Sequence, residues 1–191
     1  EGLENWDVSK GKRFYGMFRY LHKLKSLGEL KNWDVSNGKD FNSMFFGCKN
    51  SKSLKGLENW NVSNGEDFGC IFGECENLES LEGLENWDVS KGIKFSYMFF
   101  GCKNLKSLKR LEKWNVSKGT SFRCMFCDCY NLKSLEGLEN WNVSNGEEFI
   151  FMFKFCKNII SFTLLENWKI NNDSKLNEIF YNYSSLTKKF I

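Results

Sequence analysis

The stretch KGLENWNVSNGEDFGCIFGECENLESLEGLENWDVS, residues 55–90, contains one phrase twice. The segment from Leu57 to Ser63 returns from Leu84 to Ser90 with a single change, Asn to Asp. Its tryptophan recurs every 27 residues, at Trp6, Trp33, Trp60, Trp87, Trp114, Trp141 and Trp168. Self-similarity at a fixed period of about 20–50 residues is the signature of a repeat architecture. The period therefore decides the fold class.

Other apolar columns keep the same step without any insertion. One is a phenylalanine column that includes Phe45, Phe72, Phe99, Phe126 and Phe153. A repeat of this length cannot bury its own apolar face, so neighbouring copies must stack to form one continuous core. Stacked aromatic residues could also form a platform for carbohydrate or single-stranded nucleic acid. Because these columns keep register with leucine and valine columns, we expect both the tryptophans and the phenylalanines to form ladders in the core.

Within one copy the spacing of apolar residues changes character. Phe41, Met44, Phe45 and Cys48 follow i, i+3, i+4 and i+7, which predicts one stripe of a short helix. The leucines that follow and the Trp-x-Val alternation favour one or two short strands. The sequence therefore predicts an α/β solenoid of about seven 27-residue coils, each with one short helix and one or two short strands. We expect the repeat solenoid to span 1–168, and the degenerate copy at 169–191 to be a C-terminal cap.

One segment resembles a known family. Residues 98–108 read MFFGCKNLKSL, and the phrase N-W-[DN]-V-S follows in nearly every copy. This pattern resembles the bacterial surface-protein repeat of about 26 residues that is grouped with the BspA-type leucine-rich repeat proteins. The resemblance implies a leucine-rich-repeat-like solenoid at the cell surface or outside the cell, with adhesion or protein binding as its role. The Asn-Gly or Lys-Gly that follows the serine departs from the family pattern.

Five of the eight cysteines form a column on the predicted helical stripe: Cys48, Cys75, Cys102, Cys129 and Cys156. Cysteine is often buried as a small apolar residue, and parallel Cβ vectors within a column are poor geometry for a disulfide. We expect buried, free thiols here. The stretch CMFCDC, residues 124–129, resembles half of a zinc site, but no second ligand pair or histidine lies near it in the sequence. The sequence therefore favours neither a metal nor a redox role, and predicts no cofactor.

Three positions between the leucines carry charges that alternate in sign from one coil to the next. We call these residues the charge ladder: Lys49, Lys52 and Lys55, then Glu76, Glu79 and Glu82, then Lys103, Lys106 and Lys109. If the coils stack directly, each glutamate has a lysine on both sides, which stabilises the register. The simpler alternative is that these charges only keep this face soluble.

Charge and composition limit the possible functions. The chain has 27 basic and 24 acidic residues, a net charge of +3, which is too balanced for a protein that binds nucleic acid through a basic face. No apolar run is long enough to span a membrane. No catalytic set of residues stands out, so we expect no enzyme. The sequence favours a surface-exposed module that binds an unidentified protein partner. The alternative is a passive scaffold or spacer that self-associates end to end or laterally, in a virus or inside a cell.

Overall fold

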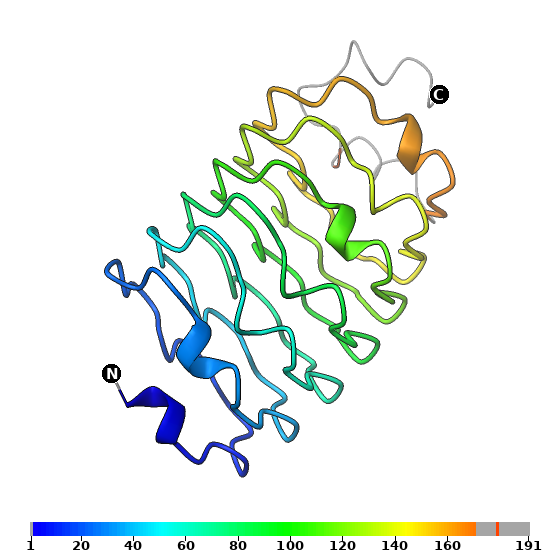
Figure 1. Ribbon diagram of the computed structural model, residues 1–191. Helices are drawn as coiled ribbons and strands as arrows, with labels where there is room; N and C mark the ends of the chain where they lie inside the picture. The colour runs from blue at the N-terminus through cyan, green and yellow to red at the C-terminus, as the bar shows by residue number, and fades with distance from the viewer. Residues whose placement is uncertain (1, 171–178, 180–191) are drawn as a thin grey trace.

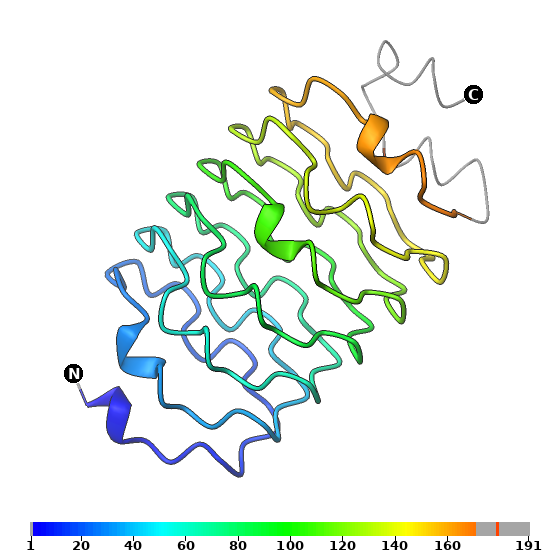
Figure 2. The same cartoon turned by 45° about the vertical axis from the view of Figure 1, so that its right-hand side comes forward.

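The computed structural model describes residues 2–170 and residue 179 of the chain. It is a solenoid whose coils stack one on another along a single axis (Figures 1 and 2). The coil around Trp6 lies at one end, and the coil that reaches Trp168 lies at the other. Each coil contains one repeat, because isolated parallel bridges join residues in equivalent positions of successive repeats, Arg13 to Asp40 and Asp40 to Asp67.

The expected α/β content is wrong. Between residues 2 and 170 the only helices are four 3-10 turns of three residues each: η1 Leu3–Asn5, η2 Gly28–Leu30, η3 Lys109–Leu111 and η4 Thr163–Leu165. No β-strand forms in this part of the chain, only the isolated bridges. The coils are built from turns and bends, so the one helix and one or two strands per coil that we expected are absent from them.

The residues expected to form a helix form two consecutive four-residue turns. The N–H of Met44 donates to the Phe41 carbonyl (3.2 Å), and the N–H of Cys48 donates to the Phe45 carbonyl (3.1 Å). Ser43, the third residue of the first turn, has a φ of 58°, which an α-helix does not allow. The first and last residues of both turns are 0–1% exposed. Their spacing is i, i+3, i+4 and i+7, so tandem turns and a helical stripe have the same apolar pattern.

Alternate N–H groups of this segment donate to the next coil instead of along their own. Phe41 donates to the Asp67 carbonyl and Ser43 to that of Gly69, both at 2.8 Å. Phe45 likewise donates to the Ile71 carbonyl at 2.9 Å. An α-helix would use these same groups within one coil. The tandem turns can replace a helix because the neighbouring coil satisfies the backbone groups that the turns leave unpaired.

The leucine-rich arm of each coil is also a series of turns, where we had expected strands. The N–H of Leu78 donates to the Cys75 carbonyl (2.9 Å). The N–H groups of Leu84 and Trp87 donate three residues back in the same way, both at 3.1 Å. Each three-residue step brings the next apolar side chain back to the core, so Leu78, Leu81, Leu84 and Trp87 are all buried. This period of three differs from the period of two of a strand.

The core consists of the stacked aromatic columns. Consecutive tryptophan rings lie 6.2–6.5 Å apart, within 14° of parallel. The indole N–H of each tryptophan from Trp33 onward donates to the leucine carbonyl thirty residues earlier, at 2.7–3.1 Å. The column from Phe45 to Phe153 is buried and stacks at 5.6–5.8 Å. Trp6 is different: it is 56% exposed, with only Trp33 stacked on it.

The predicted cap at 169–191 lies outside the described residues, except for Lys169, Ile170 and Ile179. Ile170 packs against the core and Ile179 is buried in it. Among the described residues, no helix is long and apolar enough to cross a membrane.

Candidate functional site

The second and third residues of both tandem turns in each coil lie outside the hydrophobic core, for example Asn42, Ser43, Phe46 and Gly47. Together they form one face of the solenoid, which we call the turn face. The residue type at these positions changes from coil to coil. The second residue of the first turn, for instance, reads Tyr15, Asn42, Gly69, Ser96, Arg123 and Ile150. Since the core columns and the Leu-Glu-Asn-Trp phrase hardly vary, the turn face is where one coil differs most from the next.

At both ends of the part of the turn face that the structure describes, a cation lies against two aromatic rings. The Arg19 guanidinium lies 4.9 Å from the Tyr20 ring centroid and 5.1 Å from that of Phe46. The Lys154 ammonium lies 4.2 Å from the Phe151 ring and 4.8 Å from that of Phe155. These aromatic residues are variable in type and several are exposed, unlike the core columns. The sequence analysis did not identify these residues because it searched for residue types that recur in every copy. Variable positions within an otherwise constant repeat would have identified them.

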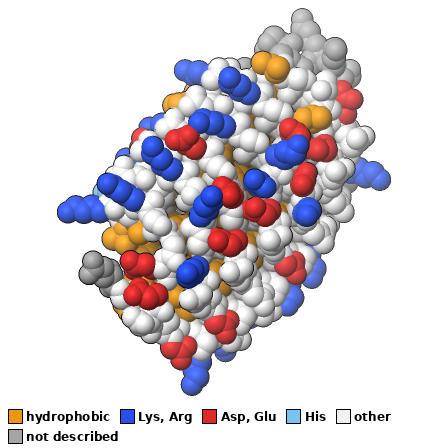
Figure 3. Space-filling view, in the orientation of Figure 1, with side chains coloured by type: hydrophobic (Ala, Val, Ile, Leu, Met, Phe, Trp, Pro, Cys, Tyr) orange, Lys and Arg blue, Asp and Glu red, His pale blue; other side chains and the backbone are white. Residues whose placement is uncertain are grey.

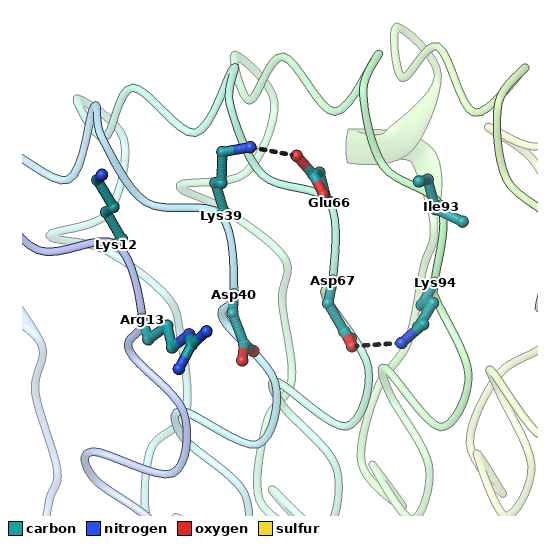
Figure 4. Close-up of a pocket in the computed structure, with 8 residues that line it drawn as sticks. All are labelled: Lys12, Arg13, Lys39, Asp40, Glu66, Asp67, Ile93 and Lys94. Atoms are coloured by element: carbon teal, nitrogen blue, oxygen red, sulfur yellow. Dashed lines mark hydrogen bonds and ion pairs between the residues drawn. The ribbon is translucent and has the colours of Figure 1, made fainter.

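A shallow groove of about 380 Å³ borders the turn face. Figure 4 shows its lining, which comes from four successive coils: Lys12, Arg13, Lys39, Asp40, Glu66, Asp67, Ile93 and Lys94. Lys39 pairs with Glu66 at 2.8 Å, and Lys94 pairs with Asp67 at 3.4 Å. The groove therefore carries both signs of charge, and much of that charge is neutralised between neighbouring coils.

The charge ladder lies on the side of the solenoid that bears η2 and η3, where Figure 3 shows basic and acidic side chains interleaved. Glu76 bridges two coils at once, with Lys49 at 2.7 Å and Lys103 at 3.0 Å. These two lysines lower the pKa of Glu76 by hydrogen bonding and by their charge. The other two glutamates of the charge ladder each pair with a lysine of one neighbouring coil only. Glu79 pairs with Lys106, and Glu82 pairs with Lys55 at 3.2 Å.

Two ladder lysines depart from the expected arrangement. Lys109 pairs with Glu136 at 2.8 Å, in the following coil. Lys52 forms no ion pair within the described part of the chain, but its charge helps to lower the pKa of Glu79. The coil register that we expected is thus the observed one, whereas the pairing is complete on both sides only at Glu76.

The cysteine column lies in the core, and all eight cysteines are free. Each column thiol donates to the phenylalanine carbonyl thirty residues earlier, as Cys48 does to Phe18 at 3.2 Å and Cys75 does to Phe45 at 3.3 Å. The other three thiols do the same at 3.0–3.3 Å. Burial raises the pKa of Cys48 to about 11 and that of Cys102 further. These are inert thiols that act as hydrogen-bond donors.

The half-site for zinc does not assemble among the described residues. Cys129 is fully buried in the core column, whereas Cys124 and Cys127 occupy turn-face positions. No group of three or more potential metal ligands occurs within residues 2–170. Of the three cysteines of the CMFCDC stretch, only Cys129 is therefore part of the hydrophobic core.

Comparison with known proteins gives a family. No curated protein and no solved structure matches the chain. A family model matches residues 1–106 and again residues 71–191, which together cover the whole sequence. The chain therefore belongs to the family described as "Mycoplasma protein of unknown function, DUF285".

Proposed function

We propose that this chain is a non-enzymatic repeat module that binds a protein partner through its turn face, at the cell surface or outside the cell. The observation that carries the proposal is the concentration of variable residues on this one face, against a nearly invariant core. Repeat proteins bind through one extended surface whose residues vary while the framework is kept. The resemblance to BspA-type surface repeats supports an adhesive role.

The composition of the turn face suits a protein partner. Tyr15 is 61% exposed, Tyr20 is 48% exposed and Phe155 is 43% exposed. Tyrosine, tryptophan and arginine are the residues that contribute most to protein–protein binding. Arg19 and Lys154 already rest on aromatic rings, so a partner meets side chains that are partly ordered in advance and lose less entropy on binding.

A second candidate is a structural role, as a spacer or a self-associating scaffold. The charge ladder favours it, because alternating charges of this kind can also pair between two solenoids. The ion pairs around Glu76 are already made within the chain, however, and a second copy would have to compete with them. For this reason we place the binding role first.

Binding of the fluorescently labelled chain to intact cultured epithelial cells tests the proposal. We expect saturable binding that unlabelled chain competes away and that trypsin treatment of the cells abolishes. A variant with Tyr15→Ser, Tyr20→Ser and Phe155→Ser should bind at least about tenfold more weakly, since aromatic residues that dominate an interface contribute more than 1 kcal/mol each. The matched control is Ile160→Ser with Leu164→Ser, two exposed apolar residues outside the turn face.

Two outcomes decide against the proposal. Equal losses in the two variants would show that the turn face is not the binding surface. No saturable binding, together with oligomers in sedimentation velocity that dissociate at high salt, would favour the scaffold role instead.

A further inference from the structure

Cys124 and Cys127 are the first and fourth residues of one hydrogen-bonded turn. The N–H of Cys127 donates to the Cys124 carbonyl at 3.1 Å. Such a turn holds the first and fourth Cα atoms within about 7 Å, which is the separation that a disulfide spans. Each of the two sulfurs also shifts the pKa of the other, since the side chains are close neighbours. The pair can therefore be joined without moving the backbone far.

The surroundings of the pair separate the two sulfurs chemically. The Cys127 thiol, the Tyr97 hydroxyl and the Arg123 guanidinium stabilise the Cys124 thiolate, and they lower the pKa of Cys124 to about 6 against the opposing effect of burial. The Arg123 Nε also donates to the Tyr97 hydroxyl at 3.1 Å, which holds both groups in place. At neutral pH Cys124 is mostly thiolate, the form of cysteine that is nucleophilic.

Cys127 shows the opposite behaviour. The Cys124 thiolate beside it raises the pKa of Cys127, and burial and the negative charge of Asp128 raise it further. The Cys127 Sγ lies 3.8 Å from the Asp128 Oδ2. Cys127 therefore stays protonated while Cys124 is ionised. The turn thus holds one nucleophilic thiolate, Cys124, and one thiol that can resolve a mixed disulfide, Cys127.

No other cysteine has this arrangement among residues 2–170. The column thiols are buried in the core and donate to backbone carbonyls. Cys70 occupies the same turn position as Cys124, two coils earlier, but Gly73 stands where that coil would need a partner thiol. Burial raises the pKa of Cys70. The chemistry thus belongs to a single coil, unlike the ladders, which recur in nearly all of them.

We propose that Cys124 and Cys127 are a redox-active dithiol that reacts with low-molecular-weight disulfides. Cys124 is 6% exposed and Cys127 is 5% exposed, so the pair is largely buried beneath the turn face and only a small disulfide can approach it. This proposal departs from the expectation from the sequence, which favoured neither a metal nor a redox role for the CMFCDC stretch. It is independent of the binding role of the turn face.

The reaction proceeds in two exchange steps. The Cys124 thiolate attacks one sulfur of the small disulfide RSSR, and the S–S bond breaks. One RS⁻ leaves, and the other RS group stays bound to Cys124 as a mixed disulfide. Cys127 then loses its proton to the departed RS⁻ and attacks the Cys124 sulfur, which releases the second RS⁻. The protein loses two electrons and forms one disulfide, and RSSR gains two electrons and becomes one thiol and one thiolate, which takes a proton from water.

The first test uses the unaltered chain, oxidised glutathione and peptide mapping by mass spectrometry at pH 6. At this pH about half of Cys124 is thiolate, whereas burial raises the pKa of Cys70 and disfavours its thiolate. The lower intrinsic nucleophilicity of the more acidic thiol removes only part of this advantage. Cys124 should therefore react several-fold faster than Cys70, and its rate should titrate with a midpoint near pH 6. The product should contain a disulfide between Cys124 and Cys127.

Three variants separate the two steps. Cys127→Ser should stop at the mixed disulfide of Cys124 with glutathione. Cys124→Ser should leave Cys127 unreacted. The control Cys70→Ser should form the intramolecular disulfide at the rate of the unaltered chain.

The proposal fails if Cys124 of the unaltered chain reacts no faster than Cys70, or if the new disulfide joins other cysteines. One equivalent of zinc per chain in elemental analysis would also overturn it, because the pair would then be metal ligands.

Discussion

Replacement of Trp87 by alanine tests whether the tryptophan ladder holds the solenoid together. Trp87 is 3% exposed, and it lies between Trp60 at 6.3 Å and Trp114 at 6.4 Å. It also contacts the Phe72 ring at 6.0 Å, and its indole N–H donates to the Leu57 carbonyl at 3.0 Å. Removing a buried tryptophan costs about 3–5 kcal/mol of unfolding free energy. In the variant the Leu57 carbonyl still accepts a hydrogen bond from the Trp60 N–H, so the loss of the indole hydrogen bond adds little to this cost.

The same column contains the matched control. Trp6 has one ring stacked on it instead of two and is 56% exposed, so Trp6→Ala removes less than half as much buried surface. We expect it to cost about 1–2 kcal/mol. In a domain of about this size, 1 kcal/mol corresponds to about 2–4 °C in melting temperature. Trp87→Ala should then lower the melting temperature by about 6–20 °C, and Trp6→Ala by at most about 8 °C.

The assay is thermal unfolding followed by far-ultraviolet circular dichroism. Because repeat proteins can unfold locally, denaturant titration with tryptophan fluorescence should accompany it. Equal shifts for the two variants, or no shift for Trp87→Ala, would refute the reasoning. The column would then be a surface feature, and the aromatic stacking platform would become the better interpretation.

Three further predictions concern the stacking of the coils. Changing Glu76, Glu79 and Glu82 together to lysine should lower the melting temperature at low salt and restore much of it at high salt; an unchanged value at low salt would contradict the observed stacking. In the unaltered chain, Glu76 has a lowered pKa, so its contribution to stability is present above pH 4.5 and is lost as the pH falls below it, as acid titration of stability will show. Gly83→Ala should destabilise far more than Gly101→Ala, because its Cβ would lie 2.4 Å from a backbone oxygen and that of Gly101 would lie 3.5 Å from its nearest atom. Similar melting temperatures of the two glycine variants would exclude this packing.

The period of the sequence was sufficient to predict the solenoid, because a column of identical residues has few ways to be buried other than by stacking. It also predicted the direct stacking of coils that the Lys49–Glu76–Lys103 contacts show. The local structure was predicted wrongly for a definite reason. Two four-residue turns and a short helix place their first and last residues on the same side. The periodicity of Phe41, Met44, Phe45 and Cys48 cannot distinguish them.

Positive φ angles distinguish the two, and the sequence marks them weakly. Gly16 and Gly47 are the expected residue type at such positions, but Tyr97 and Cys124 also adopt them, with φ of 59° and 52°. A strained conformation of a non-glycine residue persists only when its surroundings hold it. Here the hydrogen bonds to the next coil hold it, and they exist only once the coils are stacked. Local propensity could not have predicted these angles.

The reactive pair was missed for a related reason. Cys124, Cys127 and Cys129 look like one cluster in the sequence, since a linear motif does not show that the third thiol points into the core. The acidifying groups come partly from another coil, where Tyr97 lies 27 residues before Cys124. Only the stacked structure brings the tyrosine hydroxyl, Arg123 and the two thiols together.

Three ladders explain why no copy contains an insertion. The indole N–H of each tryptophan and the thiol of each column cysteine reach thirty residues back to a buried carbonyl. Asn64 reaches 28 residues back in the same way, to the Ser36 carbonyl at 2.8 Å. An added residue in any arm would shift one of these donors past its acceptor and leave a buried polar group unpaired, which costs about 1–3 kcal/mol. On the turn face the side-chain type is not restricted, because the bonds between coils are made there by the backbone whatever side chain is present. The same architecture that fixes the length of every coil therefore leaves this one face free to change, which is where both the binding surface and the dithiol that we propose are located.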